Sequence, residues 1–103
     1  MRPELKLTFY PRFLIAHECA HHVYRHLTHL GRAEVFGIDV LNHMLRQAEL
    51  DADCFATKAL REHDIEAVRS AQWVFDNSAA ITSASHPSGM ERVSHIELCL
   101  HQQ

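Results

Sequence analysis

Two histidines separated by three residues are the feature of this sequence that most directly suggests chemistry. They lie in the segment His17-Glu18-Cys19-Ala20-His21. Because residues i and i+4 share a face of a helix, the imidazoles of His17 and His21 can reach one zinc ion. Glu18 is rotated about 100° from His17 around such a helix. A carboxylate there can take a proton from a water molecule during hydrolysis, but it points too far round to be a third ligand.

A third metal ligand is expected from a different element, since a catalytic zinc usually has three protein ligands and one open position. The segment AELDADCFA, residues 48–56, places Glu49 and Asp53 one helical turn apart. We expect Glu49 to be the third ligand and Asp53 to accept the outer N–H of a ligand histidine. The competing interpretation is that both are solvated acids on a surface helix, although acidic residues at this spacing repel each other mildly.

The remaining histidines near the motif and the cysteines are interpreted more simply. His22, His26 and His29 lie further round the predicted helix, on its solvent side. Cys19 and Cys54 point away from the expected ligands, so we interpret both as small buried hydrophobic residues. Three cysteines without a closely spaced pair argue against a disulfide framework and favour a reducing, cytoplasmic location.

The elements that must position these residues are mainly helical. Residues 4–10, ELKLTFY, alternate between apolar and polar side chains and predict a short strand closed by Pro11. Helical periodicity follows over residues 12–30, with Gly31 as a stop signal, and over 34–62, with a break expected near 37–42. Asp64 is expected to cap a third helix, in which Trp73 belongs to the protein core. Residues 77–89 are predicted to form a loop, and Pro87 is predicted to begin a last helix. The predicted fold is mainly α, a compact bundle of four or five helices with one short N-terminal strand.

Two of these helices are defined by apolar stripes. The stripe of the first helix comprises Phe13, Ala16, Ala20, Val23, Tyr24, Leu27 and Leu30. The stripe of the last helix comprises Met90, Val93, Ile96 and Leu100. Each set follows the 3.6-residue period of a helix with one buried face.

Length and charge limit the classes of protein that the chain can represent. With 103 residues it is expected to form a single domain over residues 1–103. The formal net charge is −3 and there is no lysine/arginine block, which argues against nucleic acid as a partner. No apolar run is long enough for a membrane span.

Three motifs in order resemble one family of enzymes. HExxH at residues 17–21, followed by ExxxD at 49–53, is similar to the gluzincin metallopeptidases. The similarity is greatest to the branch that contains the CAAX prenyl-protein protease and the bacterial heat-shock membrane protease. Residues 85–93, SHPSGMERV, resemble the Ser/Thr-His-Pro-x-x-x-x-Arg segment of that branch. A weaker resemblance is to peptidases that cleave phage-type repressors, whose acidic helix usually has Asn where this chain has Asp53.

The resemblance implies a minimal zincin-like core that binds zinc through His17, His21 and Glu49. Glu18 would be the general base. His86 would be a second catalytic residue near the substrate or oxyanion, with a loop histidine beside a helix as the equally weighted alternative.

The same resemblance gives Asp53 and Arg92 supporting roles behind the ligands, with Arg92 as a structural ion-pair partner. In the related proteins an active-site strand pairs with extended substrate, and here only residues 4–10 could supply it.

Three functional hypotheses follow. The first is a zinc metallopeptidase acting on a peptide or protein substrate. The alternative is a catalytically silent or latent regulatory module that binds proteins, in which the segment before Phe13, or Cys99 and His101, fills the open zinc position. The third is a helical interaction protein with accidental histidines. Glu18 favours an enzyme, because a purely structural zinc site needs no base. A homodimer or a larger parent protein is compatible with each hypothesis.

Overall fold

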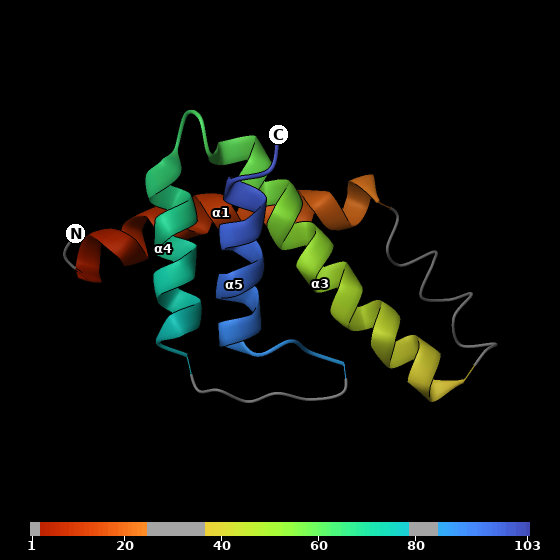
Figure 1. Cartoon of the computed structure of the whole chain (residues 1–103). Helices are drawn as coiled ribbons and strands as arrows, with labels where there is room; N and C mark the ends of the chain where they lie inside the picture. Colours follow the sequence, from red (N-terminus) through yellow and green to blue (C-terminus); the bar gives the residue numbers. More distant parts are fainter. Residues whose placement is uncertain (1–2, 25–36, 79–84) are drawn as a thin grey trace.

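Four helices form the part of the chain that the structure describes. The computed structural model describes residues 3–24, 37–78 and 85–103, with side chains from Thr8 onward. The helices are α1 (Pro3–Val23), α3 (Ile38–Leu60), α4 (Ile65–Asp76) and α5 (Gly89–Leu100). As Figure 1 shows, α4 and α5 lie side by side and α3 crosses obliquely next to α5, while α1 packs against α4 and α3. The predicted mainly α fold is confirmed.

The predicted N-terminal strand is wrong, because residues 4–10 belong to α1. Alternation over seven residues is a weak signal when tertiary packing favours a helix. Tyr10 and Phe13 both pack edge-to-face on Phe75 of α4, with ring centroids 6.0 and 6.2 Å apart. A helical turn places these two rings on the same side, and the helix continues through Pro11. Residues 4–10 therefore provide no strand that could pair with a substrate.

A small core joins all four helices. Its buried members are Phe13, Ala56, Ala67, Val68, Ala71, Phe75 and Ile96. The two phenylalanines fill the space between α1 and α4, which are in extensive contact. Within the described residues, no helix is long and apolar enough to cross a membrane.

The predicted apolar stripes are only partly buried. Phe13 and Ala20 are buried in α1, but Val23 and Tyr24 are 61% and 43% exposed at its end. The predicted continuation of this helix to residue 30, with His26, His29 and the stop at Gly31, lies outside the described residues.

The later helices show the same mixture. In α5, Ile96 is buried and Val93 and Leu100 pack against the core, but Met90 is 59% exposed. Trp73, expected in the core of α4, is only half-buried.

The helix starts follow local chemistry, with three corrections. Gly37 precedes α3 at a φ of 105°, a left-handed conformation that glycine accepts, but the helix is continuous from Ile38, so the expected break does not extend over residues 38–42. Asp64 precedes α4 as predicted, yet its carboxylate accepts a hydrogen bond from Arg12 rather than capping the helix. The last helix begins after Ser88, not at Pro87, because Ser88 and Glu91 form a reciprocal capping box.

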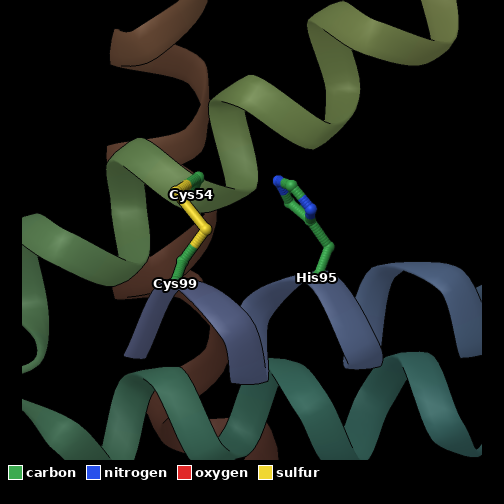
Figure 2. A group of neighbouring side chains, drawn as sticks. All are labelled: Cys54, His95 and Cys99. Atoms are coloured by element: carbon green, nitrogen blue, oxygen red, sulfur yellow. A yellow bond between two sulfur atoms is a disulfide. The ribbon is translucent and has the colours of Figure 1, made fainter. Parts of the chain in front are cut away.

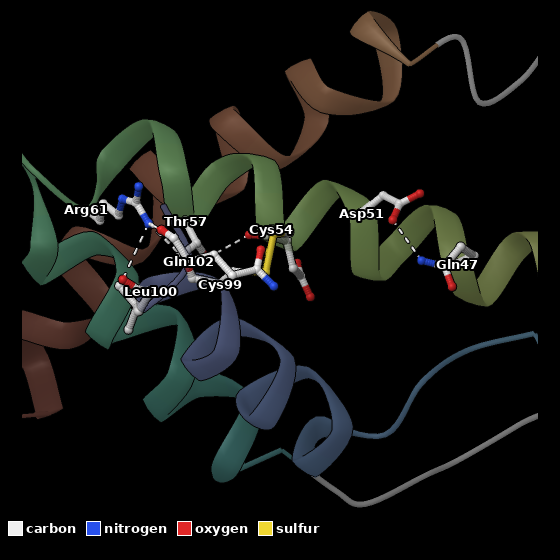
Figure 3. Close-up of a disulfide and its surroundings, with 9 residues drawn as sticks. Gln47, Asp51, Cys54, Thr57, Arg61, Cys99, Leu100 and Gln102 are labelled. Atoms are coloured by element: carbon white, nitrogen blue, oxygen red, sulfur yellow. Dashed lines mark hydrogen bonds between the residues drawn. A yellow bond between two sulfur atoms is a disulfide. The ribbon is translucent and has the colours of Figure 1, made fainter.

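The interpretation of the cysteines is wrong at both sites. Cys54 of α3 and Cys99 of α5 form a disulfide, with Cα atoms 5.5 Å apart, and Cys19 is exposed. Cys54 and Cys99 are 45 residues apart, so their proximity arises only when α5 packs on α3. Figure 3 shows this bond beside Arg61, whose guanidinium donates hydrogen bonds to the last carbonyls of α5. The C-terminal end of α5 is thus tied to α3 twice.

Candidate metal centre

The packing of α1 on α3 brings the three predicted ligands together. His17 and His21 lie one turn apart on α1, and their Nε2 atoms are 3.0 Å from each other. Glu49 faces both of them from α3. Its carboxylate oxygens lie 3.4 Å from His17 Nε2 and 3.1 Å from His21 Nε2. Two imidazole nitrogens from α1 and one carboxylate from α3 therefore converge, with a different carboxylate oxygen nearest to each histidine.

The spacing of these donors fits a tetrahedral zinc. With zinc–ligand distances near 2.0–2.1 Å, the edge of the coordination tetrahedron is about 3.3 Å. The observed separations of 3.0, 3.1 and 3.4 Å bracket this value. The two imidazole rings are almost perpendicular, at 81°, and their Nε2 atoms both lie close to the Glu49 carboxylate. Two imidazoles and one carboxylate are a donor set that zinc accepts well.

Asp53 fixes the orientation of the His17 ring. The side chain of His17 is 4% exposed and that of Asp53 is completely buried. His17 Nδ1 donates to Asp53 Oδ1 over 2.8 Å, since a carboxylate can only accept. The Nε2 lone pair of neutral His17 is consequently left to face His21 and Glu49. The predicted role of Asp53 as acceptor of the outer histidine N–H matches this geometry.

Arg92 completes the support from α5. Its guanidinium donates twice to Asp53, from Nε over 2.7 Å and from Nη2 over 2.8 Å. The same guanidinium lies 3.7 Å from the centroid of the Phe75 ring, a cation–π contact. A buried carboxylate needs paired hydrogen bonds to offset its lost hydration, and Arg92 and His17 provide three. Asp53 thereby connects α1, α3 and α5 at one point.

The charges of the cluster reinforce one another. Burial disfavours the charged form of His17, but hydrogen bonds to Asp53 and Glu49 outweigh it and raise the pKa of His17 to about 9. The hydrogen bond from His17 in turn lowers the pKa of Glu49, against the opposing effect of burial. Because metals bind the deprotonated imidazole, an arriving cation would displace a proton from this pair.

Glu18 lies close to the two histidine donors. It is exposed, and its carboxylate, His17 and His21 offer donor atoms that all lie within 4.8 Å of one another. This is the placement expected for a base that reaches a water molecule at the site. His22, one residue beyond His21, is exposed as predicted.

The described contacts of His86 are with Ser85 and Arg46. Its ring is exposed, with Nδ1 2.8 Å from the hydroxyl of Ser85, and its carbonyl accepts a hydrogen bond from Arg46. Arg46 also forms an ion pair with Glu91, so this loop is attached to α3 and α5. A catalytic role for His86 stays a prediction.

The segments proposed to block the site have other contacts. Cys99 is bonded to Cys54, and the ring of His101 lies 3.2 Å from the carboxylate of Glu97. The residues before Phe13 continue the helix that carries His17. Neither terminus, as far as the structure describes it, supplies a fourth ligand.

Sequence reasoning missed Phe75 as part of this centre. Its ring contacts Tyr10, Phe13 and Arg92, and so places the core directly behind the polar cluster. Phe75 follows the helical spacing of Val68 and Ala71, but this spacing carries no information about a cation resting on its ring. His95, which lies beside the Cys54–Cys99 disulfide, was also missed.

Comparison with known proteins gives one match. The family model of peptidase family M48 matches residues 27–99, more than half of the chain. The matched range includes Glu49, Asp53, His86 and Arg92, and it begins after the His17–His21 motif. No curated protein and no solved structure matches the chain significantly.

Proposed function

Because the chain belongs to peptidase family M48, we propose that it is a zinc-dependent metallopeptidase with His17, His21 and Glu49 as ligands. The observation that carries this proposal is the convergence of both histidine Nε2 atoms and the Glu49 carboxylate from two separate helices, with contacts of 3.0–3.4 Å. The substrate would be a peptide or protein. We also propose that, within the family, the chain is related to the branch that contains the CAAX prenyl-protein protease and the bacterial heat-shock membrane protease.

The residues of the chain have distinct tasks in hydrolysis. Zinc, when bound, supplies a Lewis acid that polarises the scissile carbonyl and makes water more acidic. Glu18 accepts the proton of the attacking water and then donates it to the departing amine. Its exposure supports this role, because the base must be open to both water and substrate.

Asp53 and Arg92 hold the centre in place. Asp53 fixes His17 in the tautomer with a free Nε2 lone pair, and Arg92 holds the Asp53 carboxylate in place through two hydrogen bonds. Misplacement of a reacting group by about 1 Å can lower a rate by about 100-fold, so this support contributes to catalysis from behind the ligands. His86 is proposed as a further catalytic residue only through the family resemblance.

Metal content tests the ligand set. Elemental analysis of the oxidised wild-type chain should find one bound zinc, and this zinc should be absent from oxidised His17→Ala and Glu49→Ala. His43→Ala, an exposed histidine on α3, is the matched control and should retain it. Zinc that persists in Glu49→Ala would contradict the proposed site.

Glu18→Gln tests catalysis separately from binding. This variant should keep its zinc while hydrolysis of an unstructured protein such as casein falls about 10²- to 10⁴-fold, the usual contribution of a general base. Glu66→Gln, at an exposed position of α4, is the control and should leave the rate unchanged.

The alternative of a silent or latent binding module makes the opposite prediction. A wild-type chain that binds zinc at His17, His21 and Glu49 but hydrolyses no peptide, with or without Glu18, would support the module and reject the enzyme. The proposed cytoplasmic location conflicts with the Cys54–Cys99 disulfide, since such bonds are rare in reducing compartments.

A further inference from the structure

A second group of metal-binding side chains lies on the other contact of α3, where it meets α5. The sulfur atoms of Cys54 and Cys99 and a ring nitrogen of His95 all lie within 4.8 Å of one another. Figure 2 shows the His95 ring beside the disulfide, with His95 and Cys99 on the same side of α5. Their spacing of four residues gives this shared face. The comparisons and the peptidase motif do not account for this group.

We propose that Cys54, Cys99 and His95 form a redox-controlled zinc site, closed by the disulfide when oxidised and able to bind zinc when reduced. Two thiolates and one imidazole are a donor set that zinc prefers. Once the sulfur–sulfur bond is broken, the sulfur atoms separate to a non-bonded distance of about 3.8 Å, which is the edge of a zinc tetrahedron with sulfur ligands. The helices already hold the three side chains at the necessary spacing.

The environment of His95 supports a ligand role. Among the residues that the structure describes, no hydrogen bond is found for its half-buried ring. The ring also lines a surface cavity of about 450 Å³ together with Leu50, Met90, Glu91, Ser94 and Leu98. Water can reach a metal from this cavity and occupy the fourth position. The opposite side is closed, because Cys99 is completely buried.

The chemical change balances with a dithiol as the reductant. The dithiol transfers two electrons and two protons to the Cys54–Cys99 disulfide and is itself oxidised to a disulfide. The sulfur–sulfur bond of the protein breaks and two thiols form. Binding of Zn²⁺ then releases one proton from each thiol, because thiolates are the ligands.

Cobalt spectroscopy tests this site independently of the proposed peptidase centre. Protein carrying His17→Ala and His21→Ala would be loaded with Co²⁺, once oxidised and once reduced with a phosphine, which does not compete strongly for the metal. The reduced protein should bind one Co²⁺ and show the near-ultraviolet thiolate-to-cobalt absorption, whereas the oxidised protein should show none. The proposal would be overturned if the oxidised and reduced proteins bound equal amounts of cobalt and the reduced protein showed no thiolate band. This holds whatever the outcome at the peptidase centre.

His95→Ala keeps both cysteines and so avoids a loss of the disulfide. We expect its reduced form to bind zinc at least about tenfold more weakly, since even loss of a supporting partner commonly costs that much. His43→Ala, in the same background, should bind like the parent protein. Unchanged affinity in His95→Ala would remove His95 from the site and overturn the proposal of a three-ligand centre.

Discussion

Asp53 and Cys54 are neighbours in sequence, yet they belong to two regions held together in different ways. Asp53 organises the polar region, where hydrogen bonds join α1, α3 and α5 around His17 and Arg92. Cys54 organises the sulfur region, where one covalent bond joins α3 to α5. Loss of one partner in the polar region leaves a buried charge behind, whereas loss of the disulfide leaves two neutral thiols. The polar region is therefore more sensitive to single substitutions, and the sulfur region to the redox state.

The strongest way to break the polar region is Asp53→Ala. Removing this completely buried carboxylate leaves Arg92 without its main partner and His17 without its acceptor. Removing one partner of a buried ion pair typically costs about 3–5 kcal/mol, so unfolding in urea should begin at much lower concentrations. Asp51→Ala removes a surface carboxylate that accepts a hydrogen bond from Gln47 on the same helix. We expect this variant to change the free energy of unfolding by less than about 0.5 kcal/mol. Similar losses in the two variants would show that the centre contributes little to stability.

Reduction of Cys54–Cys99 breaks the sulfur region alone. Opening this loop should lower the free energy of unfolding by about 2–4 kcal/mol through the greater freedom of the unfolded chain. Denaturation of metal-free protein with and without a phosphine measures the difference. Cys19→Ser should lose the same amount of stability on reduction as the wild type, because the exposed Cys19 is not part of the disulfide. No change on reduction would mean that the disulfide does not constrain the unfolded state.

Gly89→Ala should disturb both regions together. A β-carbon at Gly89 would overlap the backbone carbonyl of Phe75, so α5 would shift relative to α4. Overpacking of this kind costs about 1–3 kcal/mol. Arg92, His95 and Cys99 all lie on α5 and would move with it. Thermal unfolding measures the loss, with Ser94→Ala, an exposed position of α5, as the control. An unshifted melting temperature would contradict the close approach of the two helices.

The smallest expected effect lies outside both regions, at Glu97. Hydrogen bonds donated by Gln72, together with those from His101 and Arg69, lower its pKa to about 2. A carboxylate with a depressed pKa stabilises the fold above pH 4.5, and this contribution is lost as the pH falls from 4.5 to 2. Because the side chain is 46% exposed, solvent screening keeps the contribution below about 1 kcal/mol.

Urea unfolding at pH 6 and pH 3 would measure this dependence in the wild type and in Glu97→Gln. The wild type should lose slightly more stability between the two pH values than the variant does. An equal loss would show that Glu97 titrates normally in the folded chain.

The polar region could be predicted from the sequence because its partners follow the helical repeat. His17 and His21 share a face through their spacing, as do Glu49 and Asp53, and the family resemblance joins the two pairs. Arg92 was expected as an ion-pair partner, and the structure pairs it with Asp53. Its position over Phe75 depends on how α5 packs against α4, which no local pattern encodes.

The sulfur region could not be predicted for the same reason. The partners Cys54 and Cys99 belong to helices whose contact is decided by the whole core, and an odd number of cysteines gave no pairing. The error at residues 4–10 has a related cause. Local alternation indicated a strand, but the contacts of Tyr10 and Phe13 with Phe75 are long-range and favour a helix.

The uneven burial of α3 has a consequence for how a metal would leave. All buried side chains of this helix lie from Ala48 onward, whereas residues 38–47 are exposed or half-buried. In Figure 1 the first part of α3 extends away from α4 and α5. Amide hydrogens there should exchange with solvent faster than those near Asp53, because local opening needs less free energy where few side chains are buried. Glu49 lies at the boundary between the two parts, so fraying of the first turns can detach one ligand while the rest of the molecule stays folded.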